Sequence, residues 1–124
     1  MLEKSSLIAF VATGRTAEAL PFYRDVLGLR LVEDSPFALV FDANGTMLRI
    51  QKLPAHTAAP FTVLGWRVDD IAAMADRLMA KGVRFERYEQ LPQDARGIWK
   101  TPDGAQVAWF KDPDRNVLSM TQMP

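Results

Sequence analysis

The sequence repeats one pattern of secondary structure twice. Each half predicts a strand, a helix and then three strands, and the two halves align with almost no gaps. The segment from Phe41 to Arg49 matches the segment from Lys111 to Ser119, and the helix ends match at Gly28 and Gly82. A single βαβββ unit leaves a sheet face that it cannot bury alone. Two such units predict an α+β fold in which a mixed sheet curves into a cup, with the helices outside. A cup is suited to a small ligand.

Length, charge and composition limit the domain organisation and the kinds of partner that the protein can have. A chain of 124 residues predicts one domain, 1–124, with module one at about 5–53, a linker at 54–60 and module two at 61–124. Lys plus Arg and Asp plus Glu are both 15, so the net charge is zero, which argues against a nucleic-acid partner. Without cysteine there are no disulfides and no thiolate chemistry. No apolar run reaches membrane-spanning length and the N-terminus is not a signal peptide, so we expect a cytoplasmic protein without a membrane partner.

In the first half, residues 7–13 are almost wholly apolar and predict a strand buried on both faces. Thr16 is a plausible N-cap for the following helix, and Pro21 implies a later start or distorted first turns. Strands are expected at 29–33, 37–42 and 46–53, with a hairpin turn at Asn44-Gly45.

In the second half, strands are expected at 61–68, 83–88, 105–111 and 117–122, and residues 98–100 are expected to lead into a turn at Pro102-Asp103-Gly104. Asp69 or Asp70 can cap the helix between the first two of these strands. Asp112 and Asp114 could suggest acid–base chemistry, but we expect them to form a turn by hydrogen bonding to their own backbone.

Two motifs carry a resemblance to a known family. The segment 21–29, PFYRDVLGL, resembles the helix signature of the glyoxalase/bleomycin-resistance/extradiol-dioxygenase family, also called the vicinal oxygen chelate superfamily. The segment 111–117, KDPDRNV, resembles that family's closing turn, where glycine usually occupies the site of Arg115. The resemblance implies a homodimer as the family default. It does not fix the activity, since the family includes lyases, isomerases, dioxygenases, thiol transferases and binding proteins.

The resemblance also implies four inward positions at which the family's metal enzymes place histidine or glutamate. On this sequence they fall at Ile8, Arg49, Val63 and Ser119. Two of these residues are aliphatic, one is a cation and one carries a hydroxyl, whereas a divalent ion needs converging oxygen or imidazole donors. We therefore expect neither a metal nor another cofactor.

Alternation along the strands extends the inward face from these four positions. The expected ligand-binding residues are Ile8, Phe10, Arg49, Gln51, Val63, Arg67, Trp99, Ser119 and Thr121. An inward arginine needs a ligand oxygen or an internal salt bridge, here to Glu86 or Glu89. Trp99 is favoured as a cavity wall, whereas Trp109 is expected in the core.

No catalytic residue is assigned. The only histidine, His56, could act as a general base at the rim of the cup, but a solvated loop histidine is the preferred interpretation. The favoured function is a metal-independent small-molecule-binding protein, with sequestration of a toxic or antibiotic-like ligand as one form of it. The alternatives are a glyoxalase-like lyase, isomerase or dioxygenase-related enzyme with non-standard active-site residues, and an accessory module that only dimerises.

Overall fold

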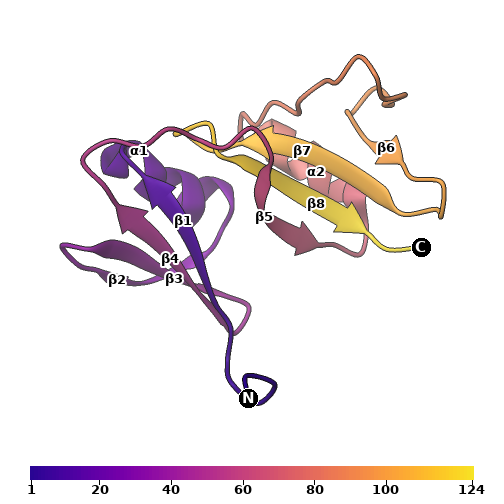
Figure 1. The fold of residues 1–124 in the computed structure, drawn as a ribbon. Helices are drawn as coiled ribbons and strands as arrows, with labels where there is room; N and C mark the ends of the chain where they lie inside the picture. The colour runs from indigo at the N-terminus through magenta and orange to yellow at the C-terminus, as the bar shows by residue number, and fades with distance from the viewer. The chain divides into compact units, whose positions relative to one another are not determined.

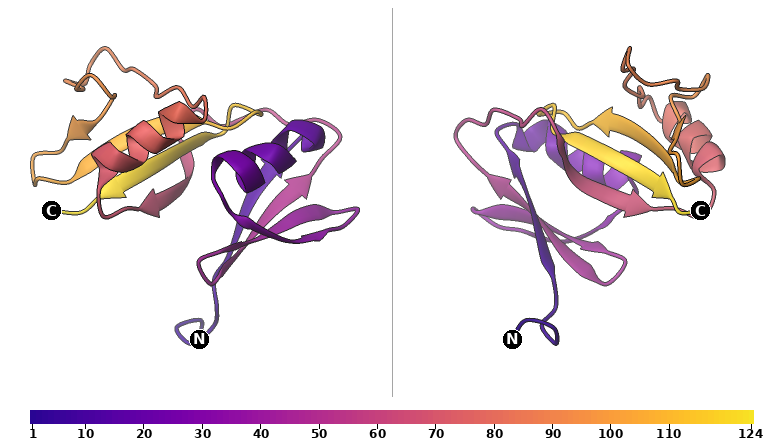
Figure 2. Two further views of the ribbon diagram at one scale, coloured as in Figure 1. Left: turned by 180° about the vertical axis from the view of Figure 1, so that it is seen from behind. Right: turned by 45° about the vertical axis from the view of Figure 1, so that its right-hand side comes forward.

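The computed structural model describes residues 1–124, which divide into two compact units, Met1–Thr57 and Ala58–Pro124. Each unit contains one βαβββ module with its own four-stranded mixed sheet (Figures 1 and 2). The structure thus has the predicted α+β class and the predicted duplication. None of the helices is both long and apolar enough to span a membrane.

Module one has a short helical segment between its first two strands. Its elements are β1 (Ile8–Thr13), α1 (Thr16–Pro21), η1 (Phe22–Val26), β2 (Arg30–Asp34), β3 (Ala38–Ala43) and β4 (Thr46–Lys52). The strand order is β1-β4-β3-β2, in which β1 runs parallel to β4 and the other pairs are antiparallel. The helical segment is the crossover that carries the chain from β1 at one edge of the sheet to β2 at the other, so that β1 and β4 can pair in parallel.

The core of module one lies between this helical segment and one face of the sheet. Tyr23 is completely buried, and its ring lies 5.2 Å from Phe22, edge to face, and 6.0 Å from Phe41 of β3. Leu48 and Ile50 of β4 are also buried. These side chains share one face, because Leu48 pairs in register with Phe41.

The helical segment differs from its prediction at both ends of α1. The N-cap is Arg15, without a side-chain hydrogen bond, and Thr16 is already helical. The hydroxyl of Thr13 instead accepts a bond from the Arg15 N–H. Pro21 ends α1, and the chain continues as a π-helical turn in which Leu27 N donates to the Phe22 carbonyl. Proline has no N–H for the helical ladder and crowds the preceding turn, and here the chain leaves α-helical geometry directly after Pro21. The first turn of α1, where the distortion was expected, is regular.

The prediction that residues 7–13 are buried on both faces is wrong. Ile8 is 46% exposed and Phe10 is 58% exposed, whereas Val11 and Thr13 on the other face are buried. The helical segment covers only one face of the sheet, so the apolar side chains on the opposite face of β1 lie open.

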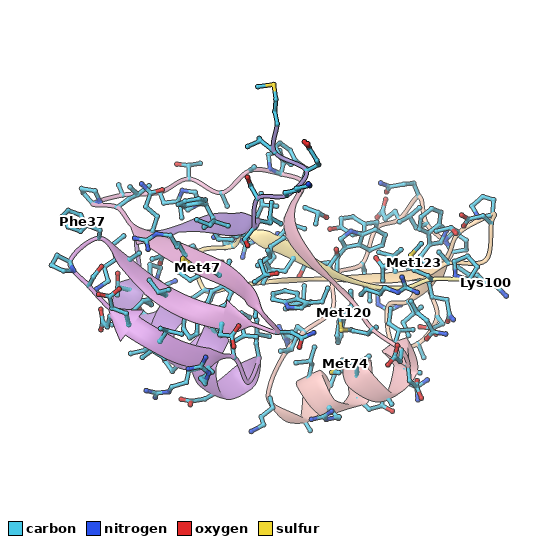
Figure 3. The ribbon with its side chains drawn as sticks, turned by 90° about the horizontal axis from the view of Figure 1, so that it is seen from below. Phe37, Met47, Met74, Lys100, Met120 and Met123 are labelled. Carbon is cyan, nitrogen blue, oxygen red and sulfur yellow. The ribbon has the colours of Figure 1, made fainter.

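Module two places a longer helix on its sheet. Its elements are β5 (Thr62–Arg67), α2 (Ile71–Ala80), β6 (Trp99–Lys100), β7 (Gln106–Lys111) and β8 (Val117–Gln122). The order is β5-β8-β7-β6, with β5 parallel to β8. Of the two candidate caps, Asp70 caps α2 by accepting a hydrogen bond from Ala73 N at 3.1 Å. Figure 3 shows Met120 of β8 on the side that α2 covers, near Met74.

Residues 83–88 do not form the predicted strand. Their one backbone bond to the sheet is from Glu86 N to the Trp109 carbonyl, at 2.8 Å. The side-chain amide of Gln93 replaces ladder bonds: it accepts from Tyr88 N at 2.7 Å and donates to the carbonyls of Glu86 and Gly97 at 2.9 and 2.8 Å. Residues 83–98 therefore form an edge segment that a side chain holds in place, visible between α2 and β6 in Figure 1.

The duplicated turns are confirmed as structural. Asp112 accepts hydrogen bonds from the backbone N–H groups of Asp114 and Asn116, both at 2.9 Å, and from the Asn116 side chain at 2.8 Å. In module one, Asp42 accepts from Gly45 N at 2.8 Å. Both carboxylates are thus occupied by their own turns, as aspartate in turns commonly is.

Replacing Arg115 by glycine is expected to stabilise the protein by about 0.5–1 kcal/mol. Arg115 has φ +68°, in the left-handed region that costs a side-chain-bearing residue about 1–2 kcal/mol, and the greater chain entropy of unfolded glycine offsets part of this gain. The measurement is urea denaturation at pH 7. Asn44→Gly is the control, because Asn44 has φ +52° but asparagine tolerates this region. A loss of stability in Arg115→Gly would contradict the expectation.

Candidate ligand-binding faces

The open face of module one carries the predicted inward residues of that half. Strand register places residues in rows that share a face: Ile8, Met47 and Asp42; Phe10, Arg49 and Val40; Ala12, Gln51 and Ala38. Ile8, Phe10 and Met47 are all more than two-fifths exposed. Around Arg49 this face is therefore apolar and accessible.

Arg49 has no internal counter-ion within its module. Its side chain is half-buried, and the ion pairs of module one join other residues: Arg15 with Glu18, Arg24 with Asp25, Arg30 with Asp42, and Lys52 with Asp34. Of the two predicted acidic partners, Glu86 instead pairs with Lys111 at 3.4 Å. The guanidinium of Arg49 keeps its donors for another acceptor.

The open face of module two has two rows. Gly65, Ser119 and Trp109 form one, and Arg67, Thr121, Val107 and Trp99 form the other. Val63 has no register partner, because Thr62 pairs with Val117 and Leu64 pairs with Leu118. This β-bulge sets Val63 apart from the regular rows, and its side chain is 39% exposed.

Trp109 is not in the core, contrary to the prediction. Ala108 and Phe110 are buried on the face that α2 covers, so Trp109 between them points to the open face, where it is half-buried. Its ring stacks on Trp99 with centroids 6.2 Å apart and planes at 24°, and Tyr88 meets it edge to face at 5.4 Å. The available signal for this orientation was strand alternation itself, which sets adjacent Trp109 and Phe110 on opposite faces so that only one of them can face the helix.

Tyr88 is held in its neutral form beside the indoles. Partial burial, followed by the nearby Glu86 carboxylate, raises the pKa of Tyr88 above its ordinary value. Because that ordinary value is about 10, the phenol is uncharged at neutral pH. The group of Tyr88, Trp99 and Trp109 is therefore an uncharged aromatic surface.

Glycine at position 65 makes room for the Ser119 hydroxyl. A Cβ atom on Gly65 would lie 2.8 Å from Ser119 Oγ, closer than such contacts occur. Ser119 is only 8% exposed. The row thus presents a hydroxyl next to Trp109 at a position where backbone approaches closely.

The backbone at His56 passes close to Gly14, the residue that follows β1. His56 is half-buried, and its backbone nitrogen would lie 3.1 Å from a Cβ placed on Gly14. The neighbouring Leu53 N donates to the Thr13 carbonyl at 2.9 Å. These contacts fix the chain around His56 and give it a structural place in module one.

The four positions that the resemblance assigns to metal ligands do not fit a divalent ion. Ile8 and Val63 offer no donor, Arg49 is a cation, and Ser119 lies in register between Gly65 and Trp109. Neither module groups three histidine or acidic side chains that could hold a metal. The donors that a divalent ion requires do not converge on either open face.

Comparison with known proteins agrees with this fold. Residues 7–120 match the family model described as Glyoxalase/Bleomycin resistance protein/Dioxygenase superfamily. The uncharacterized protein YraH of Bacillus subtilis (strain 168) is 29% identical over 123 residues, covering 86% of this chain and 88% of its own.

Two solved structures illustrate the range of this fold. Lactoylglutathione lyase from Agrobacterium tumefaciens superposes with a TM-score of 0.73 at 20% identity, covering 97% of this chain and 95% of its own. TnmS3, an antibiotic binding protein from Streptomyces sp. CB03234, superposes with a TM-score of 0.73 at 24% identity, covering 100% and 99%. At these identities the likeness concerns the fold alone. Because the family model spans nearly the whole sequence, the chain belongs to the glyoxalase/bleomycin resistance protein/dioxygenase superfamily.

Proposed function

We propose that the protein binds a small organic molecule without a metal and sequesters it without transforming it, with a toxic or antibiotic-like compound as the ligand. The observation that carries this proposal is the pair of open faces, each of which combines apolar side chains with an arginine. Ligand sites are commonly built as apolar surfaces with a few polar anchors. The binding residues are Ile8, Phe10, Arg49 and Gln51 in module one, and Val63, Arg67, Trp99, Ser119 and Thr121 in module two.

A glyoxalase-like lyase or isomerase is the second candidate, because the fold is shared with a lactoylglutathione lyase. That chemistry uses an ion to stabilise an enediolate and a base to move a proton. Arg49 and Ser119 stand where the resemblance implies a glutamate or histidine. The residue types therefore favour binding over this reaction.

The test combines native mass spectrometry with metal analysis of gently purified protein. We expect a bound organic molecule, no stoichiometric zinc, nickel, iron or manganese, and no turnover of a thiol–methylglyoxal adduct with or without added metal. One equivalent of metal surviving dialysis, or turnover well above background, would overturn the proposal in favour of the enzyme.

We extend the proposal to a cytoplasmic homodimer that binds no nucleic acid. The exposed apolar side chains of Val32 and Phe37, which lie outside the proposed binding residues, support self-association, and the zero net charge supports the absence of a nucleic-acid partner. Light scattering of the full chain should give twice the monomer mass. A monomer at high micromolar concentration would remove the dimer from the proposal and leave ligand binding to be judged separately.

A further inference from the structure

We infer that the open face of module two selects a planar aromatic ligand that bears an anionic group, with the ring stacked on the Trp99–Trp109 pair and the anion held by Arg67. This inference rests on the proposed function and specifies the chemical class of its ligand. It follows from which side chains lie on this face and from which of them have no partner in the protein.

The aromatic end of the face is assembled before any ligand arrives. Trp99 is fixed by the pairing of β6 with β7, where it lies in register with Val107, and Trp109 belongs to β7 itself. The two indoles stack at 6.2 Å and Tyr88 braces Trp109 from its edge. Both indoles stay partly exposed. A ligand ring can extend this stack without first ordering the indoles. Aromatic ring pairs contribute binding free energy beyond the area that they bury.

The opposite end of the same row carries a positive charge. Arg67 is exposed and forms neither an ion pair nor a side-chain hydrogen bond within module two. Other cations of this module are engaged: Arg96 binds Asp76 through two bonds, Arg87 donates to the carbonyls of Asp94 and Ala95, and Lys111 pairs with Glu86. Arg67 therefore has a planar fork of donors available to a carboxylate or a similar oxygen group.

The spacing between the two ends sets the shape of the ligand. Arg67, Thr121, Val107 and Trp99 follow one another across four neighbouring strands. Three strand spacings separate the first Cα atom from the last by about 14 Å. The flexible arginine side chain can extend into this span from one end, and the stacked indoles bound its other end. A fused-ring acid lying across the strands would contact both ends, with the Thr121 hydroxyl and Val107 beneath it.

The sign of the charge distinguishes this ligand from other aromatic compounds. The two rows contain one cation and no carboxylate. Glu86, whose backbone N–H donates to the Trp109 carbonyl, has its carboxylate paired with Lys111. An aromatic acid is therefore attracted, a neutral aromatic compound binds through stacking alone, and an aromatic cation is repelled by Arg67.

The experiment compares three probes that share one ring system. 2-Naphthoate, 2-naphthalenemethanol and 2-naphthylmethylammonium are titrated into the full chain, and binding is followed by calorimetry and by the NMR signals of the indole N–H groups. We expect the acid to bind about tenfold more tightly than the alcohol, which corresponds to about 1.4 kcal/mol, and the ammonium to bind most weakly. The signals of Trp99 and Trp109 should shift, whereas that of Trp66 should not.

Variants separate the two ends of the site. Arg67→Met should reduce the affinity for the acid to that for the alcohol and leave the alcohol unchanged, while Trp99→Leu should weaken both. The matched control is Arg84→Met: Arg84 is also exposed and unpaired in module two, but it lines a separate depression of about 590 Å³ beside α2. This control should bind every probe as the parent does.

Each result distinguishes the inference from the proposed function. Equal binding of acid and alcohol, an unchanged Arg67→Met variant, or no binding of any naphthyl probe would overturn the aromatic-acid class. The small-molecule function would survive those results if native mass spectrometry still detected a bound organic compound. Stoichiometric metal would instead overturn the proposed function, whatever the naphthyl probes do.

Discussion

Replacing Tyr23 by alanine is expected to lower the free energy of unfolding by about 4 kcal/mol, within the range for removal of a fully buried aromatic side chain. Tyr23 is completely buried and touches the rings of Phe22 and Phe41, so the substitution leaves a cavity between the helical segment and β3. Tyr23 lies in the π-helical turn Phe22–Val26, and we expect the hydrogen bonds of this turn to limit how far the backbone can move to refill the cavity.

Chemical denaturation monitored by circular dichroism provides the measurement. Tyr23→Phe keeps the ring and should cost much less. Phe22→Ala should also cost less, because Phe22 is only half-buried. A Tyr23→Ala variant within about 1 kcal/mol of the parent would mean that the helical segment contributes little to the module-one core.

Replacing Asp112 by alanine is expected to cost about 3 kcal/mol. Asp112 is 5% exposed and accepts three hydrogen bonds from Asp114 and Asn116, and Asn116 is itself buried at 2%. Hydrogen bonds to a charged group contribute more than neutral ones, and their loss leaves buried donors unsatisfied. For a domain of this size the melting temperature should fall by roughly 10 °C. An unchanged melting temperature would contradict this account of the turn.

The duplicated turn supplies the control. Asp42→Ala should cost clearly less than Asp112→Ala, because Asp42 is partly exposed. The Gly45 N–H, and then the Arg30 side chain, lower the pKa of Asp42 below its ordinary value. A lowered folded-state pKa stabilises the protein above the unfolded-state value of about 4, and this contribution is lost as pH falls through the lower folded-state value. The difference between parent and Asp42→Ala should therefore be present at pH 7 and shrink under strong acid.

The sequence predicted the fold well because the same pattern of strands, helix and turns occurs in both halves. The strand at 117–122, the α2 stripe and the turn carboxylates each had a counterpart or a periodic pattern that fixed their place. The resemblance placed Arg49 and Ser119 on the inward face of their strands, and in the structure Arg49 pairs in register with Phe10 and Ser119 with Gly65. Whether these faces bind the expected ligand remains a prediction.

The errors arose where tertiary contacts, and not local pattern, decide the outcome. Residues 83–88 have strand-like composition, yet the amide of Gln93 takes the bonds that a strand would offer. Trp109 was assigned to the core by residue type, although its neighbours Ala108 and Phe110 determine its orientation. At β1, apolar composition could not reveal that only one sheet face has a covering helix.

The edge segment 83–98 bears on which part of module two can accept substitutions during evolution. Two members of the aromatic group, Tyr88 and Trp99, lie in or beside it, and of the buried apolar side chains of module two it contributes only Ile98. Gln93 holds the segment through local bonds, and its ties to the scaffold are few, namely the Phe85 ring on Phe110, Glu86 N on the Trp109 carbonyl, and Arg96 on Asp76. Residues of such a segment that make none of these contacts are the ones that tolerate change. Under the proposed function, a change confined to this short stretch of chain would alter ligand preference while the β5, β7 and β8 scaffold stays the same.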